Sequence, residues 1–332
     1  MSYHCSNSVC ANHTAQLPQA AAEKLDFKCF LCETGKLVIP QMTLDVMLKE
    51  VDSLPIALQI MPRLNTLLND DHSTMHDIIN VTRTDAALVT QIIKISNSAI
   101  YAMTDSRFCS TLEEALNRIG FNTAYKVVGY VAAKQIFQKD LKLYCMTGLE
   151  LWEMSVRTAI CMQNMADRIE VSSDSYVNPN NSTAYTVGLL YPIGKMLINH
   201  YHETIAIPAL SGAKYPLTEE LEKKLLGFNH RDAAKRLLAH WGFQDEVILP
   251  IFFQSKPLKS EGDRPVACLL AMIAGAVEQF PVSLDIRQEA MAEKYQTNSE
   301  YAAIVGIPKN DFLQEIANSA SECLQLAHKL AQ

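Results

Sequence analysis

The sequence predicts an all-α protein with a small separate module at its N-terminus. From residue 42 onward, apolar side chains recur at the three- and four-residue spacing of amphipathic helices. The longest uncharged apolar run, Val266–Val277, suits a buried core helix and is shorter than the roughly 20 residues needed to cross a bilayer. Residues 1–40 differ from the rest, because four of the nine cysteines lie within the first 32 positions.

The composition is that of an ordinary globular protein. Apolar residues make up 48% of the 332 positions and charged residues 20%, a balance that can fill a sizeable core. The length suggests two or three domains, which we place at residues 1–40, 41–257 and 258–332. The net charge of −7 disfavours non-specific binding of nucleic acid by the whole chain.

The N-terminus lacks the basic and then apolar segments of a signal peptide. We therefore expect a cytoplasmic protein that has no membrane partner. Structural disulfides are not expected in that compartment.

The N-terminal cysteines have the spacing of a structural zinc site, so residues 1–40 are expected to form a small zinc-ribbon-like module. The four candidate ligands are Cys5, Cys10, Cys29 and Cys32. The second pair forms a CxxC motif followed by Gly35, and four thiolates can hold one Zn²⁺ in a closed tetrahedral site. His4 or His13 could replace one cysteine as a ligand. A tail with reduced thiols is the alternative, whereas a redox CxxC would need a βαβ context that is missing.

Capping signals divide the first part of the helical region. Leu54-Pro55 marks a helix start, since proline is accommodated in the first turn. Ser73 or Thr74 is expected to cap the next helix, and Thr84 or Asp85 the one after it. Thr111, followed by acidic residues, begins a further helix that ends at Gly120.

The second part of the chain continues in the same way. We expect helices over residues 121–137 and 149–169, then a polar loop at 172–183. The segment Val187–Ile198, VGLLYPIGKMLI, is predicted to be the central core helix. Asn229 to Asp232 resembles a capping box, and Gly242 stops the helix that follows. Further helices are expected at 218–226, 265–279 and 310–330.

An ordered set of motifs in residues 54–120 resembles the HDOD family, the HD-related output domain of bacterial signalling proteins. The matching positions are Leu54-Pro55, Asp85, Asn97-Ser98-Ala99, Ala115, Ile119 and Gly120. The chain departs from the family at Ala86, where proline is common. The resemblance covers about residues 54–257 and implies an HD-domain-like helical bundle with a role in signal output or relay.

The resemblance also implies that the metal ligands of the HD superfamily are replaced. In HD phosphohydrolases, a context such as GLLHDIGKL carries a histidine–aspartate pair, and here Tyr191-Pro192 stands in its place. Met154 and Gln254 stand where other histidines would be expected. Divalent metals in hydrolases bind imidazole nitrogens and carboxylate oxygens, so we expect no enzyme activity.

The other polar candidates favour structural roles. His200 and His202 are two apart on a helix and do not face each other. His230 is expected to be a capping or packing residue, and Asn97-Ser98 to satisfy backbone groups. Lys195 does not belong to a phosphate-binding loop, because GxxxxGK[ST] is not matched.

The sequence therefore predicts a non-catalytic signalling domain that binds a protein partner of its pathway or a small ligand. Two alternatives stay open. One is a divergent metal-dependent phosphohydrolase. The other is a nucleic-acid-binding regulator that acts through the zinc ribbon, although basic residues there are few.

Overall fold

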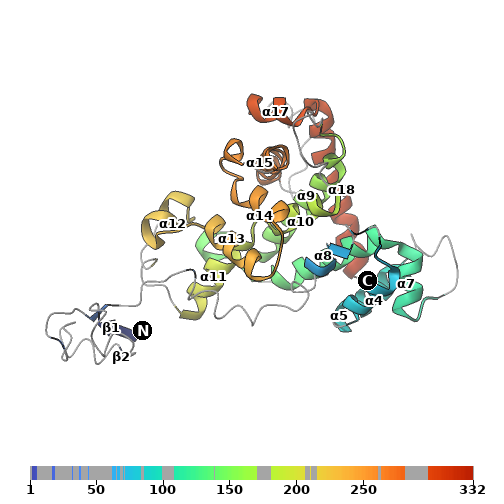
Figure 1. Cartoon of the computed structure of the whole chain (residues 1–332), viewed down its shortest axis with the longest axis horizontal. Helices are drawn as coiled ribbons and strands as arrows, with labels where there is room; N and C mark the ends of the chain where they lie inside the picture. Colours follow the sequence, from blue (N-terminus) through green and yellow to red (C-terminus); the bar gives the residue numbers. More distant parts are fainter. Residues whose placement is uncertain are drawn as a thin grey trace.

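The computed structural model shows a bundle of α-helices and, at the N-terminus, a small antiparallel sheet (Figure 1). It describes residues 2–5, 17–18, 32, 37–38, 44 and most of 62–331, with gaps at 65, 68–69, 71, 84–85, 99–107, 138, 170–180, 206–209, 211–214, 261–262 and 281–297. The predicted helix start at Leu54-Pro55 and the predicted cap at Thr84 or Asp85 lie outside these residues.

Four helices form the first part of the bundle, and their starts follow the capping signals. They are α4 (Met75–Thr82), α5 (Ala86–Ser96), α7 (Leu112–Ile119) and α8 (Phe121–Ile136). Thr74 caps α4, with Asp77 accepting a hydrogen bond from its backbone N–H at 2.9 Å. Thr111 caps α7 through a reciprocal pair of hydrogen bonds with Glu114. Both caps were predicted from the sequence.

The centre of the bundle is α9 (Gly148–Ala166), which is buried along most of its length. The helix α10 (Asn181–Leu190) packs directly against it. A Cβ atom on Gly188 would lie 2.6 Å from the Cα atom of Ala159, so the two backbones can approach this closely only because position 188 has no side chain.

The prediction of one core helix over Val187–Ile198 is wrong. Two helices share this segment, because α10 ends at Leu190 and α11 (Ile193–Ile205) begins after a turn at Tyr191-Pro192. Proline has no N–H to continue a helix, whereas it is well tolerated at a helix start. The carbonyl group of Pro192 instead accepts a hydrogen bond from Lys195 N at 3.0 Å within the first turn of α11.

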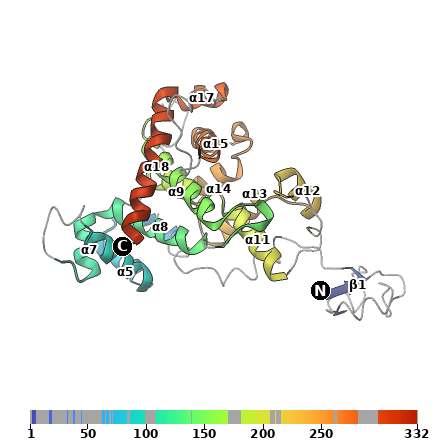
Figure 2. The same ribbon diagram turned by 180° about the vertical axis from the view of Figure 1, so that it is seen from behind.

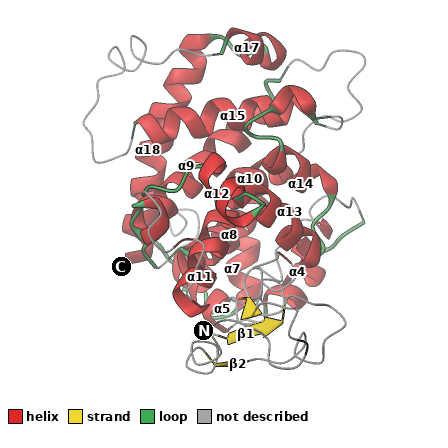
Figure 3. Cartoon of the chain, turned by 90° about the vertical axis from the view of Figure 1, so that its left-hand side faces the viewer, coloured by secondary structure: helices red, strands yellow, loops and turns green. Residues whose placement is uncertain are grey.

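The remaining elements complete the bundle (Figure 3). They are η3 (Lys142–Tyr144), α12 (Glu219–Leu226), α13 (His230–His240), α14 (Asp245–Phe252), η5 (Pro257–Lys259), α15 (Arg264–Gln279), α17 (Ser299–Val305) and α18 (Lys309–Ala331). The predicted capping box of α13 is confirmed: the Asn229 side chain accepts hydrogen bonds from Arg231 N and Asp232 N at 3.0 and 2.9 Å.

The C-terminal helices pack on the same core. Both α15 and α18 contact α9, and α18 runs from beside α17 to beside α5 (Figure 2). The side chain of Arg157 on α9 lies within this contact, only 1% exposed. Its guanidinium donates to the backbone carbonyls of Phe280 and Ile316 and pairs with Glu153 at 3.3 Å. One buried arginine thus ties α9 to the end of α15 and to α18.

The N-terminal sheet consists of β1 (Ser2–Cys5), β2 (Leu17–Pro18) and β3 (Leu37–Val38), in the order β2-β1-β3. Both pairings are antiparallel, and Cys5 on β1 lies opposite Leu37 on β3. Cys10 and Cys29 lie outside the described residues. The described backbone therefore shows a strand pairing in this part of the chain and no zinc-ribbon module.

Within the part of the chain that the structure describes, every helix is too short or too polar to span a bilayer.

Candidate functional site

The junction of α10 and α11 carries Tyr191 and Pro192, the residues that are expected from the sequence to stand in place of the histidine–aspartate pair. Both are buried. Burial raises the pKa of Tyr191 well above its ordinary value, with the Glu278 charge acting in the same direction. Thr158 lies beside the phenol, but neither hydroxyl group makes a hydrogen bond of good geometry to the described residues. At neutral pH the phenol therefore stays protonated and does not offer an anionic oxygen to a metal ion.

Two further replaced metal ligands are expected from the sequence, at Met154 and Gln254, and neither side chain is an imidazole or a carboxylate. Met154, on α9, is half-buried and packs against the hydrophobic core. Gln254 follows α14 in a turn, where its backbone N–H donates to the carbonyl of Ile251 at 3.4 Å. Over the described ranges, no three His, Cys, Asp or Glu side chains come close enough to hold a metal ion.

Beside this junction lies a buried polar cluster that joins four elements. Glu222 on α12 is fully buried and accepts hydrogen bonds from the Tyr144 hydroxyl at 2.7 Å and from His230 N at 2.7 Å. Nδ1 of His230 lies 2.8 Å from the same carboxylate. Lys195 of α11 sits over the Tyr144 ring and pairs with Glu278 at 3.9 Å. The sequence indicated His230 as a structural residue but gave no sign of its partners.

Protonation in this cluster follows from its burial. Burial lowers the pKa of His230 against the opposing hydrogen bond and charge of Glu222, so the imidazole is neutral at pH 7 and donates from Nδ1. Burial would raise the pKa of Glu222, but the hydrogen bond and charge of His230, together with the Tyr144 hydroxyl, hold it below its ordinary value. The cluster is therefore a satisfied hydrogen-bond network that locks α12 and α13 to η3.

The free energy of unfolding should fall as the pH is lowered from 7 to 5. The unfolded state takes up a proton on His230 near pH 6.5, whereas the folded state does so only at lower pH. The contribution of His230 to the free energy of unfolding is thus complete above about pH 6.5. It is lost below that pH, by at most about 1.4 kcal/mol per pH unit. Glu222 adds a further loss only below about pH 4.5, its unfolded value.

Urea denaturation at several pH values measures this slope. In a His230→Gln variant it should be shallower between pH 7 and 5. The control His240→Gln changes an exposed histidine on the same helix and should leave the slope as in the unaltered protein. Equal slopes in the His230→Gln variant and the unaltered protein would contradict the assignment.

Asn97 has a structural role. Its side chain donates to the carbonyls of Ile93 and Cys109 at 3.0 and 2.8 Å, and its Oδ1 accepts from Cys109 N at 2.8 Å. Arg118 adds a contact to Oδ1 at 3.4 Å. This asparagine joins the end of α5 to the segment before α7, as expected for a residue that satisfies backbone groups. His200 and His202 both lie on α11, where positions two apart face different directions.

The elements described so far define a class of protein: an all-α bundle with a central helix, α9, against which α10, α15 and α18 pack. The HDOD domain model matches residues 54–257, more than half of the chain. The chain belongs to the HDOD family.

Solved structures from several bacteria share the fold. An HDOD domain protein of unknown function from Geobacter sulfurreducens is 17% identical, with a TM-score of 0.60 over 87% of this chain and 96% of that one. A protein from Marinobacter aquaeolei provisionally named a signal transduction protein is 20% identical, with a TM-score of 0.63 over 89% of this chain and 62% of that one. One from Shewanella amazonensis provisionally named a phosphohydrolase is 22% identical, with a TM-score of 0.58 over 86% and 97%.

Among curated proteins, an uncharacterized protein of Treponema pallidum is 21% identical over 224 residues. The match covers 67% of this chain but only 41% of that relative, so the chain spans less than half of the relative's length.

Proposed function

We propose that this protein is a non-catalytic signalling module that binds a protein partner of its pathway or a small ligand. The observation that carries the proposal is the occupation of the metal position by Tyr191 and Pro192, buried in the core with no acidic or imidazole group in their place. Met154 and Gln254 extend the same replacement to α9 and to the turn after α14. Membership of the HDOD family and one structural neighbour provisionally named a signal transduction protein support the proposal.

Purified protein should hydrolyse neither cyclic dinucleotides nor nucleoside phosphates in the presence of Mg²⁺ or Mn²⁺. Positions 154, 191, 192 and 254 carry no imidazole or carboxylate, and among the described residues no three His, Cys, Asp or Glu side chains lie close enough to hold a metal that activates water. Product formation is measured by chromatography. Metal-dependent turnover that disappears in His230→Ala but persists in His240→Ala would overturn the proposal in favour of a divergent phosphohydrolase.

We also propose that the N-terminal cysteines Cys5, Cys10, Cys29 and Cys32 hold one structural zinc ion. The antiparallel pairing of β1 with β3 supports this, because it sets Cys5 opposite Leu37, five residues beyond Cys32 along the chain. Thiolates from two such segments can close a tetrahedral site. The site is proposed as a structural element, and His4 or His13 remains a possible replacement for one cysteine.

Elemental analysis of protein purified without chelator should find about one zinc ion per chain. The double change Cys29→Ser/Cys32→Ser should remove it, because zinc binds the thiolate and serine offers none. Cys145→Ser, at an exposed cysteine of the helical domain, is the control and should keep the metal. Zinc that survives the double change would show that the metal lies elsewhere.

A further inference from the structure

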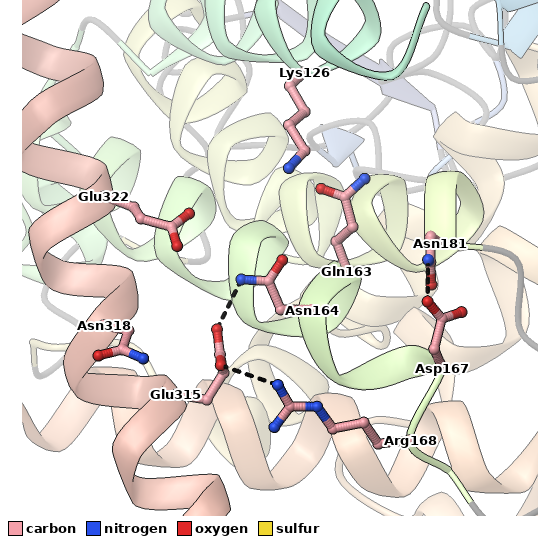
Figure 4. A pocket seen from close by; sticks show the side chains of 9 residues that line it. All are labelled: Lys126, Gln163, Asn164, Asp167, Arg168, Asn181, Glu315, Asn318 and Glu322. Carbon is pink, nitrogen blue, oxygen red and sulfur yellow. Dashed lines mark hydrogen bonds and ion pairs between the residues drawn. The ribbon is translucent and has the colours of Figure 1, made fainter.

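A polar pocket of about 430 Å³ opens at the C-terminal end of α9, away from the α10–α11 junction (Figure 4). Its side chains come from α8, from α9 and the turn after it, from the start of α10, and from α18 near the other end of the chain. The lining contains two basic residues, three acidic residues and four amides. All of the lining residues are polar or charged, so the pocket is not a packing defect between apolar side chains of the core.

Part of the lining is already neutralised by contacts within the protein. Glu315 accepts a hydrogen bond from Asn164 Nδ2 at 2.7 Å and pairs with Arg168 at 3.7 Å. Asp167 accepts a hydrogen bond from the Asn181 side chain. These contacts fix the rim of the pocket and engage both carboxylate oxygens of Glu315 and one of Asp167.

The floor of the pocket carries a polar group without a partner. Gln163 is only 8% exposed, its amide is directed into the pocket in Figure 4, and its Oε1 makes no hydrogen bond to the described residues. The Oδ1 atom of Asn181 is also buried and makes no hydrogen bond to the described residues. A buried carbonyl oxygen without a donor costs free energy, so both positions are suited to accept N–H groups from a ligand.

Opposite charges face the same space. Lys126 on α8 extends toward the Gln163 amide, and its Nζ forms no hydrogen bond or ion pair to the described residues. Burial lowers the pKa of Lys126, while the charge of Glu322 on α18 raises it, which places the two groups within electrostatic reach. The pocket therefore offers a cation for a ligand carboxylate, and the Glu322 carboxylate with the Gln163 carbonyl for a ligand ammonium.

We infer that this pocket binds a small zwitterion of the amino acid type. The ligand's carboxylate would pair with Lys126, and its ammonium group would lie toward Glu322 and the Gln163 carbonyl. An anion such as phosphate is disfavoured because the lining has three acidic groups against two basic ones. The C-terminal end of α9 also favours a positive group nearby.

The inference deepens the proposed function, because it rests on a non-catalytic signalling domain and names the class of small ligand that the domain would sense. Contacts from both α9 and α18 to one ligand would couple occupancy of the pocket to the packing of α18. The two proposals fail separately: a domain that hydrolyses phosphates fails the first, and a domain that binds no zwitterion fails only the second.

The test is isothermal titration calorimetry of the full chain with the twenty common amino acids, one at a time. At least one should bind with a stoichiometry of about one, and Lys126→Met and Gln163→Leu should each weaken binding about tenfold or more. Glu322→Gln, at an exposed position, provides a third variant that is expected to fold normally. Lys134→Met on α8 and Gln279→Leu on α15 change exposed residues of the same kinds outside the pocket and should leave the affinity unchanged.

Three outcomes would overturn the inference. They are no binding by any amino acid, an affinity unaffected by both Lys126→Met and Glu322→Gln, or equally tight binding of acetate or methylammonium alone. The last outcome would show a site for a single charge rather than for a zwitterion.

Discussion

Replacing Gly194 with alanine is expected to destabilise the helical domain by about 3 kcal/mol or more. A Cβ atom at this position would lie 1.8 Å from the carbonyl oxygen of His230 and 2.7 Å from its carbonyl carbon. Both are backbone atoms of α13, so no side-chain rotation can relieve the overlap. The only response is to move α11 away from α13, which would also loosen the Glu222–His230 cluster.

Urea denaturation of the purified variant measures this loss, and Gly275→Ala is the matched control. Gly275 lies in the middle of α15 with no atom within 4 Å of the position its Cβ would take. Alanine there should be neutral or stabilising by about 0.5–1 kcal/mol, because glycine is a poor helix former. Similar free energies of unfolding for the two variants would show that α11 and α13 are not packed as closely as the structure has them.

Replacing Arg157 with methionine is expected to cost about 3–5 kcal/mol. Methionine fills much of the same volume, but the carbonyl groups of Phe280 and Ile316 lose a charged donor, and Glu153 loses its buried counter-ion. Removing one partner from a buried charged network costs more than the network contributes, since the remaining groups stay desolvated.

The control for this prediction is Arg168→Met, in the turn that follows the end of α9. Arg168 is half-exposed and pairs with Glu315 at 3.7 Å, so its loss should cost about 1 kcal/mol or less. Adding Glu153→Gln to Arg157→Met should recover part of the loss, because it removes the charge that the guanidinium had paired with. If Arg157→Met unfolds no more easily than Arg168→Met, the guanidinium does not hold α9, α15 and α18 together.

Helix positions were predictable where the signal is local. Thr74, Thr111 and Asn229 cap their helices through residues two or three positions away, and these short patterns are visible in the sequence. The junction at Tyr191-Pro192 was missed because α10 and α11 are both buried there. Their apolar residues continue the same periodicity across the turn, so the hydrophobic pattern outweighed the proline.

The charged residues inside the bundle could not be predicted in the same way. Arg157 and Glu222 lie on helices with polar neighbours, where a charge usually points to solvent. Their burial depends on partners more than 70 residues away, such as Tyr144 for Glu222 and Phe280 for Arg157. The pocket at the end of α9 is similar, because Lys126 and Glu322 meet only through the tertiary fold. The replacement of the metal-binding pair by Tyr191-Pro192 stays a prediction, and it rests on the local motif around these two residues.

The position of α18 has a consequence for the order in which the chain folds during synthesis. The guanidinium of Arg157 donates to the carbonyl of Ile316, a residue 159 positions later. At a synthesis rate of about 5–20 residues per second, roughly 8–30 s pass between the two. During that interval α9 cannot make its contacts with α18, and Arg157 has only its earlier partners, Glu153 and then Phe280. The bundle can therefore begin to form early on the ribosome but closes only when its last helix has been made.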